Sequence, residues 1–186
     1  MEAHLIELRF HGRGGQGVVT AAELFARAAA YEGKTVQSIP YFGAERRGAL
    51  VVAYARVSDN KIWLREPVYN PDIIIILDQS AINEINILDG VKNGGILIIN
   101  STRSPSEIKT KLATSLQVFT ADATGIALKT LRRPIVNTLM LGALSTATGL
   151  ITMDSIRRAI LYRFPNVNIQ VNMQAVEQTA TSTISA

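Results

Sequence analysis

Two continuous apolar runs in the middle of the chain constrain its fold more than any other feature. The first run, PDIIIILD, covers residues 71–78, and the second, GGILIIN, covers residues 94–100. Neither run alternates between apolar and polar positions, so each predicts a strand that is buried on both faces, as in a parallel sheet. Three apolar side chains between the runs stand at helical spacing and predict a helix in residues 79–93: Ile82, Ile85 and Leu88. The middle of the chain is therefore predicted to be strand, helix, strand.

The rest of the chain predicts further strands and helices of the same kind. Apolar, turn-bounded stretches predict strands at 5–10, 34–42, 49–58 and 116–122, with a hairpin partner of the third strand at 61–66. Helical spacing and cap residues predict helices at 18–31, at 106–113, after Pro134 and after a cap at Thr152 or Asp154. Residues 166–180 fit both a strand and a helix, and we favour a helix. The predicted fold is α/β, a single Rossmann-like domain over residues 1–186, with a largely parallel (mixed) sheet flanked by helices and a helical C-terminal part.

Composition excludes several classes of function. The 186 residues contain no cysteine, which excludes disulfides, thiolate zinc sites, iron–sulfur clusters and a cysteine nucleophile on this chain. The start of the sequence lacks the features of a signal peptide, and its apolar runs are too short to cross a bilayer. We therefore expect a cytoplasmic protein that does not bind a membrane.

The positive charge of the chain is small and arranged in pairs. The formal net charge is +4, and the paired arginines are Arg46 and Arg47, Arg132 and Arg133, and Arg157 and Arg158. No aromatic residues are interleaved with these pairs, as a surface that stacks bases would need. Solvated faces or an acidic partner explain the pairs better than a nucleic acid does.

A glycine-rich loop follows the first predicted strand and precedes the first predicted helix. Gly12, Gly14 and Gly17 fit the pattern G-x-G-x-x-G, and Gly15 is a fourth glycine in the same six positions. Glycines allow a tight turn and a close approach of the backbone to a ligand, and the free N–H groups of the helix start attract an anion such as a pyrophosphate. The alternative is that the turn needs glycines only for its own geometry.

Two familiar nucleotide sites do not fit this loop. An NAD site would place an acid at the end of the second strand, but Ser38 and Tyr41 stand in that region and Glu45 is the nearest acid. A Walker A loop is excluded because no Lys-Ser or Lys-Thr pair follows Gly17.

Polar residues follow several predicted strands and would meet at one edge of a parallel sheet. They stand in four segments: 11–17, 41–48, 78–80 and 100–102. The segments supply backbone donors, hydroxyls and the cations Arg13, Arg46 and Arg47, but no catalytic centre and no set of metal ligands. His11 has no acid or nucleophile partner in the sequence, so a structural role is the better interpretation.

Two motifs together resemble a known family. Residues 11–62 carry HGRGGQG and, some 25 residues further on, FGAERRG. This region resembles the gamma subunit, or gamma domain, of the 2-oxoacid:ferredoxin oxidoreductases, which include the pyruvate, 2-oxoisovalerate, 2-oxoglutarate and indolepyruvate enzymes. PDIIIILDQSA, GGILIINSTR and NTLMLGAL are similar to the family too. One departure is Leu50, where many members carry Pro or a small polar residue.

The resemblance implies a multi-subunit enzyme that is inactive as this chain alone. Such enzymes oxidatively decarboxylate a 2-oxoacid, pass the acyl group to coenzyme A and send two electrons to ferredoxin. Thiamine diphosphate and the iron–sulfur clusters are then expected on partner subunits, which agrees with the absence of cysteine here. The expected partners are alpha and beta subunits, with a delta subunit as a further candidate, and ferredoxin reached through the complex.

The resemblance also assigns site residues. The family's glycine loop corresponds to Gly12, Gly14, Gly15, Gln16 and Gly17, and its second motif to Glu45, Arg47 and Gly48. We expect the loop and Arg13 to hold the diphosphate of coenzyme A with help from Arg47, while Glu45 and Arg47 equally fit a pair that holds the loop or a subunit interface.

Asn137 and Gly142 fall in a third motif of the family. For these two residues a polar contact at a helix start and close helix packing are the better interpretations. The weaker alternatives for the whole chain are a free-standing Rossmann-type dehydrogenase and a regulatory nucleotide-binding module.

Overall fold

Four parallel strands form the centre of the structure, a computed structural model that describes residues 5–41 and 48–186. They are β1 (Leu5–Arg13), β4 (Ile73–Ile76), β5 (Ile96–Asn100) and β6 (Gln117–Ala121). Every residue of β4 is buried, and so is every residue of β5 except Ile96. The prediction of buried parallel strands in the two apolar runs is confirmed.

Three antiparallel pairings complete the sheet and make it mixed. The hairpin of β2 (Thr35–Tyr41) and β3 (Leu50–Ser58) pairs with β1 through β3, and the short β7 (Ile184–Ser185) pairs with β6. The described residues thus form a seven-stranded sheet in the order β2-β3-β1-β4-β5-β6-β7. The predicted α/β class with a largely parallel, mixed sheet is confirmed.

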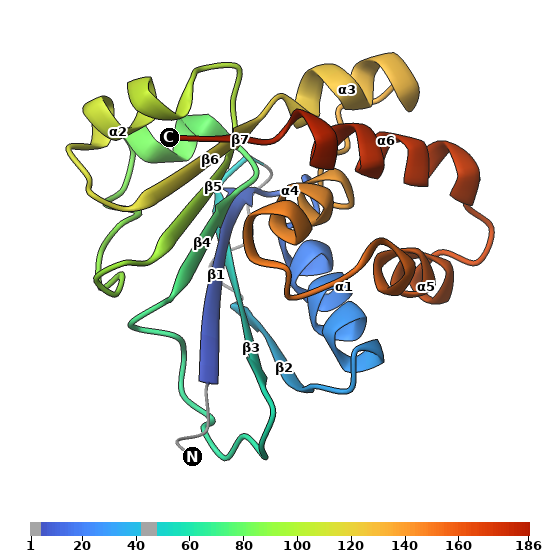
Figure 1. Cartoon of the computed structure of the whole chain (residues 1–186), viewed down its shortest axis with the longest axis horizontal. Helices are drawn as coiled ribbons and strands as arrows, with labels where there is room; N and C mark the ends of the chain where they lie inside the picture. The colour runs from blue at the N-terminus through green and yellow to red at the C-terminus, as the bar shows by residue number, and fades with distance from the viewer. Residues whose placement is uncertain (1–4, 42–47) are drawn as a thin grey trace.

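Helices cover both faces of the sheet (Figure 1). One face carries α1 (Val18–Tyr31), α3 (Ala123–Thr130), α4 (Leu139–Thr148), α5 (Met153–Arg163) and α6 (Ile169–Ser182). The other face carries α2 (Pro105–Leu112) and the 3-10 helix η1 (Gln79–Asn83). Within the described ranges, no helix combines the length and the apolar character needed to cross a membrane.

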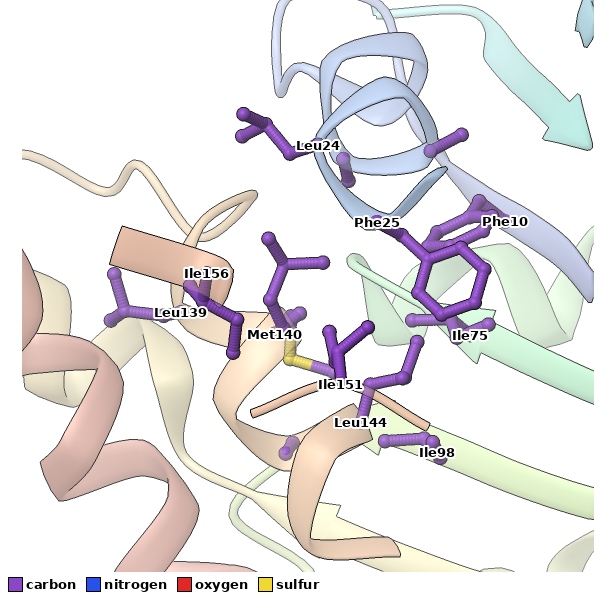
Figure 2. Close-up of a cluster of buried hydrophobic side chains, with 14 of the residues drawn as sticks. Phe10, Leu24, Phe25, Ile75, Ile98, Leu139, Met140, Leu144, Ile151 and Ile156 are labelled. Carbon is purple, nitrogen blue, oxygen red and sulfur yellow. The ribbon is translucent and has the colours of Figure 1, made fainter. Parts of the chain in front are cut away.

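Two hydrophobic cores lie on the two faces of the sheet. The larger core joins Phe10 and Phe25, whose ring centroids are 6.2 Å apart, to Met140 and Leu144 of α4 and to Ile75 (Figure 2). The smaller core contains the neighbouring β4 residues Ile74 and Ile76, packed with Ile108 of α2. Successive residues of β4 therefore enter opposite cores, which is why its sequence shows no polar alternation.

Side-chain caps fix the starts of several helices, among them α2, α5 and α6. Ser104 and Glu107 form a capping box at α2, and the Thr152 hydroxyl accepts from the Ser155 N–H at α5. Thr152 rather than Asp154 is therefore the cap. Asn168 caps α6 by accepting from the Val171 N–H, and the helical interpretation of the last segment is confirmed. The predicted helix after Pro134 begins only at Leu139.

The predicted helix in residues 79–93 is wrong apart from the five residues of η1. Side chains bind backbone groups at both ends of this segment and hold it in turns. The Asp78 carboxylate accepts from the Ser80 N–H, and the Ile87 carbonyl accepts from the Arg9 guanidinium. Ile87 is buried here, whereas Ile85 is 39% exposed. Apolar spacing therefore predicted burial of Ile85, whereas the buried side chain is that of Ile87.

The predicted hairpin partner at residues 61–66 is also wrong, because this segment forms no strand. Its carbonyl groups bind side chains instead. Gln37 Nε2 donates to the Leu64 carbonyl, and Arg56 donates to the carbonyls of Glu66 and Pro67. The strand that actually pairs with β3 in a hairpin is β2.

Candidate functional site

The glycine loop connects β1 to α1 at the edge where the parallel strands end. Gly15 has a φ of 93° and Gly17 has a φ of 77°, and both values lie in the left-handed region that favours glycine. A Cβ atom on Gly17 would also lie 2.4 Å from Asn137 Nδ2. Turn geometry alone therefore accounts for the glycines at positions 15 and 17.

The third motif lies directly behind this loop. Asn137 is 8% exposed, and its Oδ1 accepts from the Thr138 N–H at 2.8 Å where α4 begins. Gly142 lets α4 approach α6 closely, since a Cβ there would lie 2.3 Å from the Val176 carbonyl oxygen. The expected helix-start contact and close helix packing are both confirmed, and Asn137 additionally supports the loop.

Gln16 ties the loop to the end of β4. Its Oε1 accepts from the Arg13 N–H at 2.8 Å, and its Nε2 donates to Asp78 Oδ2 at 2.7 Å. The other Asp78 oxygen accepts from the N–H and the hydroxyl of Ser80 at 2.9 and 2.7 Å. Burial acts to raise the pKa of Asp78, but the hydrogen bonds from Ser80 and Gln16 and the charge of Arg13 outweigh it and lower the pKa below its usual value. Asp78 is thus an ionised acceptor that fixes the loop.

Arg13 joins the first motif to the second. Its Nε donates to Ser80 Oγ and its Nη1 to the Gly48 carbonyl, each at 2.9 Å, and its Nη2 pairs with Glu84. The Gly14 N–H donates to the Ala49 carbonyl at 2.9 Å. Gly48 therefore lies beside the glycine loop as predicted. Glu45 and Arg47 lie outside the described residues.

Arg13 already binds Ser80, the Gly48 carbonyl and Glu84, so a phosphate at this guanidinium would share it with protein groups. The described structure thus gives Arg13 the role of holding the loop. Contact of Arg13 with a diphosphate stays a prediction.

A groove of about 620 Å³ opens on the other side of the loop. Gly15, Gln16, Gly17 and Thr20 form one wall. The opposite wall is mostly apolar and comes from the second half of the chain: Leu131, Ile135, Phe164, Val167 and Val171, with Asn137, Asn168 and Asn172 as amide groups among them. The groove is large enough for a cofactor-sized ligand.

Arg133 lies on the lining of this groove and forms no ion pair with any described carboxylate. Its neighbour Arg132 does not line the groove. Sequence reasoning assigned this arginine pair to a solvated face or an acidic partner and so missed Arg133 as a residue of the groove. The only signal was the pair itself, because nothing in the sequence shows that residue 133 folds back onto residues 15–17.

The start of α1 opens onto the same groove. Gly17 offers no side-chain cap, and the first turn of α1 contains no acid. The first N–H groups of a helix lack partners within the helix, and its dipole makes this end positive. Together with Arg133, the helix start favours an anionic ligand.

A second, polar pocket of about 360 Å³ lies where β4, β5 and β6 end. It brings Asp78, Gln79 and residues 100–102 together, as predicted for strand ends of a parallel sheet. Asn100 Nδ2 donates to the Leu77 carbonyl and to Thr124 Oγ1, each at 2.8 Å. These polar groups satisfy one another, and the described part of the chain contains no cluster of three metal-ligating side chains.

His11 is buried on β1 with 4% of its surface exposed, and neither ring nitrogen has a hydrogen-bond partner among the described residues. Burial, with a smaller effect of the Arg9 charge, lowers the pKa of His11 to about 3. A neutral, buried imidazole with no acid beside it agrees with the predicted structural role rather than with catalysis.

Acid should therefore destabilise the fold through His11. In the unfolded chain the imidazole has a pKa near 6.5, so between pH 6.5 and pH 3 it is protonated in the unfolded state and neutral in the folded state. The free energy of unfolding therefore falls as the pH drops through this range. Between pH 7.5 and pH 5, this residue should remove about 2 kcal/mol of unfolding free energy. Urea denaturation at both pH values should show a loss that is about 2 kcal/mol smaller in His11→Leu. An equal loss in both proteins would show that His11 is protonated in the folded state.

Comparison with known proteins agrees with these features. The family model described as pyruvate ferredoxin/flavodoxin oxidoreductase matches residues 7–182. A relative from Thermococcus kodakarensis, the pyruvate/ketoisovalerate oxidoreductases common subunit gamma, is 44% identical over 97% of this chain and 98% of its own length. The pyruvate synthase subunit PorC of Methanocaldococcus jannaschii is 45% identical over 93% of this chain and 94% of its own length.

Solved structures show the same fold. The crystal structure of the pyruvate oxidoreductase subunit PORC from Thermotoga maritima is 33% identical, covers 98% of both chains and has a TM-score of 0.84. A 2-oxoglutarate:ferredoxin oxidoreductase from Magnetococcus marinus, solved with 2-oxoglutarate, coenzyme A and succinyl-CoA bound, is 19% identical with a TM-score of 0.78. The match covers 95% of this chain and 30% of that one, and it shows the fold alone.

A mixed sheet covered by helices on both faces, with a glycine loop between its first strand and its first helix, defines a Rossmann-like α/β fold. The chain belongs to the pyruvate ferredoxin/flavodoxin oxidoreductase family. The resemblance to the gamma subunit of the 2-oxoacid:ferredoxin oxidoreductases is confirmed, and the chain functions as a subunit of such an oxidoreductase. The free-standing dehydrogenase and the regulatory module are not favoured.

Proposed function

We propose that residues 1–186 act as one gamma domain that supplies one side of a coenzyme A site at a junction with partner subunits. The assembled enzyme would oxidatively decarboxylate a 2-oxoacid to an acyl-CoA and pass the electrons to ferredoxin. Thiamine diphosphate and the iron–sulfur clusters would be bound by alpha, beta and delta partners. Coenzyme A supplies the thiol that accepts the acyl group.

The groove beside the glycine loop is the observation that carries this proposal. It combines the uncapped start of α1, the Arg133 cation, which pairs with no described carboxylate, and an apolar wall with three amide side chains. A diphosphate suits the helix start and the cation, while the amides and the apolar wall suit the pantetheine arm of coenzyme A. The Magnetococcus marinus oxidoreductase that was solved with coenzyme A bound has the same fold as this chain.

The remaining predicted residues would position the loop. Gln16 and Asp78 hold the backbone of Arg13 and the turn that follows it. Arg13 links the loop to Gly48 and η1, so the proposal assigns the direct charge contact to Arg133 and leaves Arg13 as an additional contact.

Replacing Arg133 by alanine tests the site. If its guanidinium binds the anionic part of coenzyme A, the KM for coenzyme A should rise about 10- to 100-fold, the effect of losing a hydrogen bond to a charged group. The measurement is acyl-CoA formation by the reconstituted complex with a saturating 2-oxoacid and varied coenzyme A.

Arg132→Ala is the matched control, since Arg132 is an exposed neighbour that does not line the groove. Its KM for coenzyme A should stay close to that of the unaltered enzyme, and 2-oxoacid oxidation without coenzyme A should be unchanged in both variants. Equal KM values for Arg133→Ala and Arg132→Ala would contradict the proposed site.

A further inference from the structure

Residues 59–71, between β3 and β4, expose a concentration of large apolar side chains. Trp63 is 76% exposed, Tyr69 is 64% exposed and Leu64 is 39% exposed. Three of the nine exposed large apolar residues of the described chain thus stand within seven positions, and two of them are the most exposed of the nine. We call this segment, residues 59–71, the aromatic loop.

The aromatic loop contains no helix or strand, yet buried and part-buried groups of the protein fix its backbone. Val68 is buried in the protein with 2% of its surface exposed. Arg56, itself 1% exposed, donates to the Glu66 carbonyl at 2.8 Å and to the Pro67 carbonyl at 3.2 Å. Gln37 Nε2 donates to the Leu64 carbonyl at 2.9 Å. The loop therefore presents Trp63 and Tyr69 from an ordered backbone, which lowers the entropy lost on binding.

The charges around these side chains are mostly positive. Lys61 lies over the Trp63 ring, with Nζ 4.0 Å from its centroid, and Arg65 is exposed. Neither side chain forms an ion pair with any carboxylate in residues 5–41 and 48–186. Of the two acids in the loop, Asp59 pairs with Lys34, and Glu66 forms no ion pair with any described side chain. Exposed aromatic rings beside unpaired cations fit an apolar pocket whose rim carries carboxylates.

The aromatic loop lies at the opposite end of the sheet from the glycine loop. It leaves β3 at Ser58, which pairs with Leu5 at the start of β1, whereas the glycine loop follows the end of β1 at Arg13. Figure 1 shows the two connections at opposite ends of the sheet. An interaction through the aromatic loop is therefore separate from the coenzyme A groove.

We propose that the aromatic loop is a docking site for another subunit of the oxidoreductase, which receives Trp63 and Tyr69 in an apolar pocket rimmed by acidic side chains. The chain's membership of a multi-subunit enzyme family requires such a surface, and this loop is the place where the described structure exposes its largest aromatic side chain. The inference depends on the chain's place in that complex and not on the coenzyme A site.

The test measures assembly of the full chain with the other subunits of its own enzyme. The double variant Trp63→Ala/Tyr69→Ala should bind them at least about 30-fold more weakly, as expected for the loss of hot-spot side chains. Tyr162→Ala is the matched control, because Tyr162 is an exposed aromatic residue, 62% exposed, on α5. Thermal melting of each variant chain should give the same midpoint as the unaltered chain, since the replaced side chains are exposed.

A charge reversal tests the acidic rim of the partner. Lys61→Glu/Arg65→Glu should slow association, and the effect should shrink as salt is raised because exposed charges are screened. Assembly of Trp63→Ala/Tyr69→Ala that is as tight as that of Tyr162→Ala would overturn the proposed docking site. A charge reversal that leaves association unchanged at low salt would overturn the acidic rim. Assembly and the KM for coenzyme A are separate measurements, so failure here is distinguishable from failure of the coenzyme A proposal.

Discussion

Replacing Arg56 by alanine is expected to lower the free energy of unfolding by about 3–5 kcal/mol, the cost of breaking a buried ion pair from one side. Arg56 is 1% exposed, and its Nε donates to Glu7 Oε1 at 2.9 Å. The alanine variant would leave Glu7 with only the longer contact of 3.7 Å to Lys92, and would leave the carbonyls of Glu66 and Pro67 without their donor. Urea denaturation at pH 7.5 measures the change.

An exposed ion pair provides the control. Lys34 and Asp59 form a contact of 2.6 Å, with their side chains 35% and 67% exposed. Lys34→Ala should cost less than about 1 kcal/mol because water screens and replaces such pairs. If Arg56→Ala costs no more than Lys34→Ala, Arg56 does not anchor this end of the sheet.

The same substitution connects stability to assembly. Arg56 holds the backbone of the aromatic loop, so Arg56→Ala should also make residues 59–71 more accessible to proteases than Lys34→Ala does. A less ordered loop loses more entropy when it binds, and assembly with the partner subunits should weaken accordingly.

The central strands could be predicted because both of their faces are buried. Ile74 and Ile76 contact one core and Ile75 the other, so an unbroken apolar run is the direct record of the sheet's two covered faces. The start of α5 was predictable for a similar local reason, since the Thr152 cap acts within three residues of the chain.

The helix at 79–93 and the strand at 61–66 were predicted wrongly because side chains from other strands bind the backbone carbonyl groups of these segments. The Arg9 guanidinium binds the carbonyls of Ile87 and Asp89, and Arg56 binds those of Glu66 and Pro67. The Arg9 contacts span 78 and 80 positions of the sequence and the Arg56 contacts span 10 and 11, and both sets occupy carbonyl groups that a helix or a hairpin would use. Periodicity in a short window contains no information about them.

The candidate site also has one part that could be predicted from the sequence and one part that could not. The glycine loop and its position between a strand and a helix were readable from the sequence, because the loop is a local feature. The opposite wall of the groove was not, since Arg133, Phe164 and Asn168 reach it only through the packing of α3, α5 and α6. The residues that line the groove opposite the glycine loop could therefore be identified only from the structure.

Replacing Gly17 by alanine is the second large expected effect, a loss of about 3 kcal/mol of unfolding free energy. Part of the loss is the cost of a left-handed backbone for alanine, about 1–2 kcal/mol. The rest arises because the new Cβ would lie 2.4 Å from Asn137 Nδ2, and Asn137 is too buried to move freely. Chemical denaturation of the chain measures the loss.

Gly15→Ala is the matched control for this substitution. Gly15 has a φ of 93°, but nothing lies within 4 Å of a Cβ added there, so only the backbone cost of about 1–2 kcal/mol applies. In the double variant Gly17→Ala/Asn137→Ala, measured against Asn137→Ala alone, the substitution at position 17 should cost only the backbone part of about 1–2 kcal/mol, because the contact with Nδ2 is absent there. Equal losses for Gly17→Ala and Gly15→Ala would show that Asn137 gives way without cost.

The double variant also separates geometry from ligand binding at the loop. With the steric conflict removed, the chain should fold, but an alanine at position 17 would still stand on the groove wall beside the start of α1. If this wall binds the diphosphate, the KM for coenzyme A should be higher in the reconstituted double variant than in Asn137→Ala alone, although the steric conflict at position 17 is absent from both. A KM that returns to that of Asn137→Ala alone would mean that the glycine at position 17 serves only the turn and the packing of Asn137 behind it.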